Sequence, residues 1–81
     1  MSDNSGAPQR VAGYNQFVKL VRKGRASKVY LASDADIFFA EKIKTELSGR
    51  GEIILETRYS SKDLATMAGV DVPTAVITEI N

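Results

Sequence analysis

The chain of 81 residues has the length of one small domain, and its 43% hydrophobic and 26% charged residues argue against global disorder. It contains no Cys and no His, which excludes disulfides and thiolate catalysis and disfavours a zinc centre, so no metal and no cofactor are expected. The net charge is +1, and no apolar run approaches the roughly 20 residues that cross a membrane, so a cytoplasmic protein is expected.

Helices and strands are predicted to alternate along residues 10–81, a single domain that follows a polar tail at residues 1–9. Helical spacing of apolar residues from Tyr14 to Val21 predicts a first helix, which ends at Gly24. The expected elements in chain order are a short strand at 10–12, this first helix, a strand at 28–32, a helix capped by Asp34 or Asp36 and ended by Gly49 and Gly51, a strand at 52–57, a helix from the capping sequence at 60–63 through Ala68, and a strand at 74–80.

This order predicts a three-layer α/β/α sandwich with a small mixed sheet of three to four strands. The apolar positions that share one side of each element are expected to form its core. They are Phe17, Val21, Val29, Leu31, Ile43, Leu47, Ile54, Leu64, Met67, Val76 and Ile77.

Positive charge is concentrated in the first part of the chain. Residues 1–33 hold six basic side chains and one acidic one, and no acid lies between Arg10 and Lys28. Such a segment is a candidate footprint for a polyanion, because each phosphate contact releases condensed counterions. A solvated basic helix face explains the same charges equally well.

The first helix carries amides and cations on one side. At 100° per residue, the polar residues collect opposite the apolar stripe, and they are Asn15, Gln16, Lys19, Arg22 and Lys23. Amides pair with base edges, while Lys and Arg hold phosphates or contact guanine. The alternative is that Asn15 only caps the helix and the others are exposed filler.

A second candidate element is the loop of Val70, Asp71, Val72 and Pro73, called here the 70–73 loop. Its valines either plug the core or form an exposed platform on which an unstacked base packs, and Asp71 is able to accept from a base amino group. Pro73 is a natural start for the strand that follows, which favours the structural interpretation.

Several motifs match one family in order. The first is Gly13-Tyr14-Asn15-Gln16-Phe17-Val18-Lys19 followed by Lys23-Gly24-Arg25-Ala26, which resembles the pattern Gly-x-Asn-Glu-x-x-Lys … Arg-Gly-x-Ala. Similar matches follow at 29–36, 61–64 and 68–73. Over residues 10–80 the chain therefore resembles the kink-turn RNA-binding ribosomal-protein superfamily, which includes the archaeal "L-seven-Ae" and eukaryotic "L-thirty-e" proteins and short bacterial-type members.

The resemblance implies a non-catalytic, monomeric protein that grips a kinked RNA loop with tandem sheared G·A pairs, either ribosomal RNA or a regulatory RNA. It places Asn15, Gln16 and Lys19 on guanine edges and the adjoining backbone. Lys23 matches a position that faces phosphates, to which the basic segment adds Arg22 and Arg25, and Lys62 matches a basic position near the RNA. Val70, Asp71, Val72 and Pro73 match the loop that covers a flipped-out nucleotide.

Two positions depart from the family pattern. Gln16 replaces the Glu of archaeal and eukaryotic members, as bacterial-type members tolerate, and Phe38 stands where a Pro is frequent. The first departure leaves the RNA preference open, because an amide accepts hydrogen bonds without adding charge.

Two other classes of function remain as alternatives. Asp34 and Asp36 follow a predicted strand, where carboxylates bind Mg²⁺ or form an aspartyl-phosphate in a small phosphatase or a receiver-like domain. Helix capping explains both aspartates without catalysis. The adjacent Phe38 and Phe39 cannot both point inward equally, so the second class is a protein-interaction module at an exposed Phe38, and the simpler interpretation is that Phe38 forms a half-buried edge.

Overall fold

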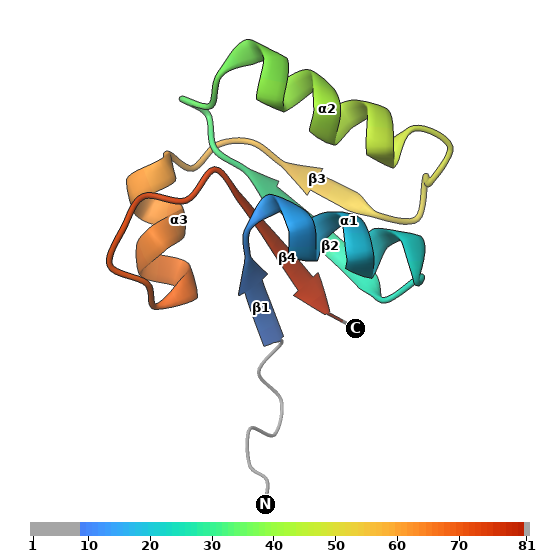
Figure 1. The fold of residues 1–81 in the computed structure, drawn as a ribbon, viewed down its shortest axis with the longest axis horizontal. Coiled ribbons are helices and arrows are strands. Elements are labelled where there is room, and N and C mark those ends of the chain that lie inside the picture. Colours follow the sequence, from blue (N-terminus) through green and yellow to red (C-terminus); the bar gives the residue numbers. More distant parts are fainter. Residues whose placement is uncertain (1–8, 81) are drawn as a thin grey trace, which may run out of the picture.

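The chain forms a four-stranded mixed sheet with helices on both faces (Figure 1). The computed structural model describes residues 9–80. Residues 1–8 of the expected tail at 1–9 lie outside the described part, and the expectation is wrong at Gln9, which pairs in β1. The elements are β1 (Gln9–Ala12), α1 (Tyr14–Arg22), β2 (Ala26–Leu31), α2 (Ile37–Leu47), β3 (Ile54–Glu56), α3 (Ser61–Ala68) and β4 (Val76–Ile80).

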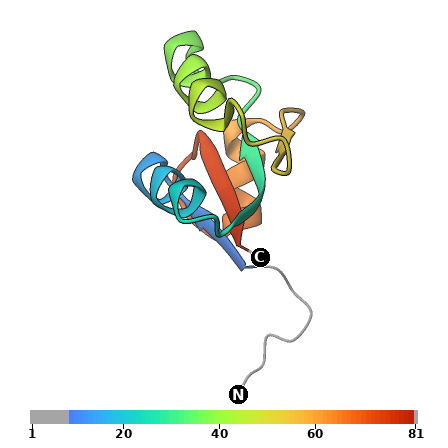
Figure 2. The same cartoon turned by 90° about the vertical axis from the view of Figure 1, so that its right-hand side faces the viewer.

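The sheet has the strand order β1-β4-β2-β3. Strand β4 runs antiparallel to both β1 and β2, and β3 lies parallel to β2 at an edge. Helices α1 and α2 lie on one face and α3 on the other, as Figure 2 shows when the sheet is seen on edge. The predicted three-layer α/β/α sandwich with a small mixed sheet is confirmed.

Two apolar clusters hold the layers together. On one face, Phe17 of α1 and Ile43 of α2 pack with Val29 of β2 and with neighbouring buried residues. On the other face, Leu64 of α3 packs with Tyr30 of β2 and Ile77 of β4. The alternation of Val29 and Tyr30 follows from the two-residue period of a strand, which sends successive side chains to opposite faces.

The prediction that Ile54 belongs to the core is wrong. Ile54 is 60% exposed, whereas Ile53 and Leu55 pack against the α1 and α2 cluster. The pairing of Ile54 with Lys28 sends its side chain to the opposite face, because neighbours in a sheet share a face. Leu47 and Met67 are partly buried, and the other predicted core residues are buried.

The helix ends follow local chemistry. Ser60 caps α3 by accepting a hydrogen bond from the backbone N–H of Asp63 at 3.2 Å, and Gly69, at φ +72°, ends it. Strands are shorter than predicted at β3 and β4, while β2 begins two residues earlier, at Ala26. Among residues 9–80, no helix has both the length and the apolar character needed to span a bilayer.

Candidate nucleic-acid interface

The outer side of α1 presents the predicted amides to solvent. Phe17 and Val21 are buried against the sheet, which leaves Asn15, Gln16 and Lys19 exposed on the other side. The N-cap is Gly13, with no side-chain capping hydrogen bond, so the interpretation of Asn15 as a helix cap is wrong. Neither amide side chain bonds to another described residue, and both are available to a ligand.

The predicted cations differ in how they are engaged. Lys19, Lys23 and Arg25 are exposed and form no ion pair within residues 9–80. Arg22 instead donates two hydrogen bonds to Glu46 of α2, from Nε at 2.9 Å and from Nη2 at 3.2 Å. These bonds lower the pKa of Glu46 and raise the pKa of Arg22, because each favours the charged form of its partner. Arg22 therefore joins α1 to α2, in addition to any role toward a ligand.

The 70–73 loop is exposed rather than packed into the core. Val72 is 66% exposed and Val70 is 38% exposed, so the expectation that these valines plug the core is wrong. The loop is fixed at both ends by the main chain: the N–H of Val70 donates to the carbonyl of Ala65 at 3.0 Å, and that of Thr74 to the carbonyl of Ser61 at 3.2 Å. Apolar side chains are thus held in solvent on a constrained backbone.

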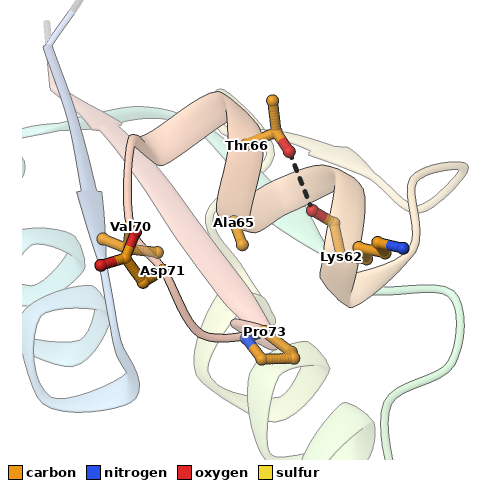
Figure 3. A pocket seen from close by; sticks show the side chains of 6 residues that line it. All are labelled: Lys62, Ala65, Thr66, Val70, Asp71 and Pro73. Atoms are coloured by element: carbon orange, nitrogen blue, oxygen red, sulfur yellow. Dashed lines mark hydrogen bonds between the residues drawn. The ribbon is translucent and has the colours of Figure 1, made fainter.

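A pocket of about 400 Å³ lies between this loop and α3 (Figure 3). It is lined by Lys62, Ala65, Thr66, Val70, Asp71 and Pro73. The Thr66 hydroxyl donates to the main-chain carbonyl of Lys62 at 3.3 Å. Sequence analysis missed Ala65 and Thr66, whose signal is their helical spacing of three and four residues from Lys62.

The start of α1 and the end of the 70–73 loop meet at one end of the sheet. The N–H of Gly13 donates to the carbonyl of Val76 at 3.1 Å, which ties the residue before α1 to the first residue of β4. Pro73 lies three residues before Val76. Figure 1 shows the loop reaching β4 beside the first turn of α1. The amide face and the apolar loop therefore border the same end of the molecule.

Both candidate catalytic aspartates accept hydrogen bonds from residues in the first turn of a helix. Asp36 is the N-cap of α2 and accepts from the N–H groups of Phe38 at 2.9 Å and Phe39 at 3.3 Å. Asp34 does not cap α2: it accepts from the main-chain N–H of Ser61 at 2.9 Å and from its hydroxyl at 3.0 Å, which together lower its pKa. Within residues 9–80, no group of three or more acidic, His or Cys side chains is arranged to hold a metal ion.

No family model matches this sequence, and no curated protein matches it either. Solved structures do match it over 90% of its length, and two of them have 27% sequence identity and a TM-score of 0.78. One is a protein with unknown function from Bacillus halodurans, of which the chain covers 72%. The other is the 15.5kD RNA binding protein of Giardia lamblia, of which it covers 61%. The chain shares its fold with an RNA-binding protein. It spans less than two thirds of the length of that protein.

Proposed function

We propose that the chain binds structured RNA without catalysis, through the outer side of α1 and the 70–73 loop. The observation that carries the proposal is the bond between Gly13 and Val76, which brings an amide-bearing helix start and an exposed apolar loop to one end of the sheet. The similarity to the Giardia lamblia RNA binding protein supports the choice of RNA as ligand.

The shape of this surface favours a distorted RNA over a regular duplex. The major groove of an A-form helix is too narrow for side chains, so sequence-specific proteins bind loops, bulges and unstacked bases. Short amides at a helix start suit base edges in a widened groove, and the free N–H groups of that first turn favour a phosphate. The apolar loop suits an extruded base.

The finer proposal is a kink-turn with tandem sheared G·A pairs, in ribosomal RNA or in a regulatory RNA, bound by a cytoplasmic monomer. Asn15 and Gln16 contact base edges, and the 70–73 loop covers an extruded nucleotide. The cations that neutralise the RNA backbone are Lys19, Lys23, Arg25, Lys62 and Arg22, the last of which keeps its contact with Glu46.

A gel-shift series tests this proposal. A kink-turn RNA is compared with the same RNA in which Watson–Crick pairs replace the G·A pairs, and we expect strong binding only to the first. Asn15→Ala should cost ~1–3 kcal/mol on the kinked RNA, because it removes a base-edge contact.

The matched control is Arg25→Ala, which should weaken binding to kinked and duplex RNA about equally, since it removes a phosphate contact that carries no sequence information. Equal binding of both RNAs by the unmodified chain, with equal losses for both variants, would reduce the interaction to general electrostatics and contradict the proposal.

A further inference from the structure

An aromatic side chain is exposed beside the proposed RNA surface. Phe38, in the first turn of α2, is 76% exposed, so the interpretation of a half-buried edge is wrong, and its neighbour Ile37 is 67% exposed. The next residue, Phe39, turns inward, where its ring meets the ring of Tyr14 edge-on with centroids 5.6 Å apart. Since consecutive helical residues differ by 100°, burying Phe39 leaves Phe38 in solvent.

The contacts of α2 show which way Phe38 faces. Lys42 and Glu46 follow Phe38 at successive intervals of four residues, so the three lie along one side of the helix. Lys42 places its ammonium 4.6 Å from the ring centroid of Tyr14 in α1, and Glu46 bonds to Arg22 in α1. This side of α2 therefore borders α1, and Phe38 lies at its N-terminal end.

That position is continuous with the amide face of α1. Tyr14, which contacts both Phe39 and Lys42, is the residue immediately before Asn15. Figures 1 and 2 show α1 and α2 running side by side in the same direction, with both first turns at the same end of the sheet. A ligand that covers Asn15 is thus adjacent to the turn that carries Phe38.

The surroundings of Phe38 fit a nucleic acid better than a protein. The core of a protein–protein interface is depleted in charged residues, but the residue that follows Phe38 on its side of the helix is Lys42, and the one that follows Ile37 is Glu41. A single flat ring beside a lysine suits a base with its phosphate. The first turn of α1 has no acidic residue, so its start carries no added negative charge to repel a phosphate. The start of α2 is different, because the Asp36 carboxylate caps it, and the cation nearest to Phe38 along its side of α2 is Lys42.

We propose that Phe38 stacks on an unpaired base of the RNA bound by α1, so that the interface extends onto the first turn of α2. This inference rests on the proposed function. Stacking on an aromatic ring tolerates every base, because each has a flat face. Phe38 therefore adds affinity for RNA with an unpaired nucleotide at that place, whatever its identity.

The test is a titration of kink-turn RNAs in which each unpaired loop nucleotide is replaced in turn by fluorescent 2-aminopurine. At one position, we expect the 2-aminopurine fluorescence to be quenched when the unmodified chain or Phe38→Tyr binds. The fluorescence at that position should not be quenched by Phe38→Ala or Phe38→Leu. Affinity should fall about tenfold in Phe38→Ala, which is within the range of losses when a base-stacking aromatic residue is replaced by alanine in other proteins. Ile37→Ala is the matched control: Ile37 is an exposed apolar neighbour, at 67%, that is not proposed to contact the RNA, so its loss should leave affinity unchanged.

Each other result overturns the stacking assignment. If Asn15→Ala weakens binding and Phe38→Ala does not, the RNA surface of α1 stands and Phe38 lies outside it. If both variants bind every RNA like the unmodified chain, the proposed function itself fails. Full affinity in Phe38→Leu would show that the contact is apolar and does not involve stacking. If the unmodified chain sediments as a dimer and Phe38→Ala does not, Phe38 contacts a second copy of the chain.

Discussion

The hydroxyl of Thr78 is an unfavourable group at the centre of the sheet. Thr78 is fully buried on β4, in register with Val11 of β1 and Val29 of β2, and its Oγ1 has no hydrogen-bond partner among the described residues. A buried polar atom without a partner loses its hydration and gains nothing in return, at a cost of about 1–3 kcal/mol.

Thr78→Val should therefore stabilise the protein, by about 1 kcal/mol, because it replaces that hydroxyl with a methyl group of similar size. Urea unfolding followed by circular dichroism measures the change. Thr74→Val is the control: the hydroxyl of Thr74 donates to the carbonyl of Val76 at 3.3 Å, so its removal should not stabilise. A less stable Thr78→Val would mean that the hydroxyl is satisfied.

At single residues, sequence analysis succeeded where a local pattern decides the outcome. The helical period of α1 correctly separated buried Phe17 from exposed Asn15. It failed at Ile54, because three apolar residues in a row, Ile53 to Leu55, do not reveal which of them faces the core. The pairing with β2 decides this, and pairing is not visible in the order of residues.

At the scale of elements, the helices were predicted well because their ends carry capping residues. Ser60 and Gly69 bound α3 as expected, and Asp36 caps α2. The contact of Asp34 with Ser61 was not predictable, since it joins residues 27 positions apart in the chain. The 70–73 loop was identified, but its exposure depends on a main-chain bond from Thr74 to Ser61 of α3, which no motif encodes.

The contact of Asp34 with Ser61 makes stability depend on pH. The main-chain N–H and hydroxyl of Ser61 hold the pKa of Asp34 below its usual value, so the ionised form is favoured in the folded protein. A group whose pKa is lower in the folded than in the unfolded state stabilises the folded protein at every pH above its unfolded-state pKa. That stabilisation is lost as the pH falls through the folded-state pKa.

Asp34→Asn should therefore be less stable than the unmodified chain by an amount that is constant at neutral pH and shrinks below about pH 4, the usual range of an aspartate. Urea midpoints between pH 3 and 7 measure the difference. Ser61→Ala removes one of the two donors and should keep part of the pH dependence. A difference that does not change with pH would show that Asp34 contributes through its shape alone.

Across the whole molecule, the small net charge hides an uneven distribution of cations. Acidic residues of α2, β3 and β4 pair with several basic side chains, as Glu46 does with Arg22 and Glu79 with Arg10. Among the described residues, Lys19 and Lys23 have no such counterion. Lys19 lies on α1, the helix that carries the amides, and Lys23 directly follows that helix. The surface that attracts a polyanion is thus set by which cations the fold leaves unpaired.

Binding to RNA should therefore weaken with salt, and the adjacent residues Lys23 and Arg22 should contribute differently. Removing one phosphate contact lowers the slope of log affinity against log salt by about 0.7–0.9, so Lys23→Ala should lower it by that amount. Arg22→Ala should lower it less, because Glu46 already neutralises that guanidinium at 2.9 Å. Lys44→Ala, on α2, should leave the slope unchanged.

Filter-binding titrations between 50 and 300 mM KCl give the slopes. An equal drop for Arg22→Ala and Lys23→Ala would mean that the RNA displaces Glu46 from Arg22, and that the pairing seen in the free protein does not select the contacts.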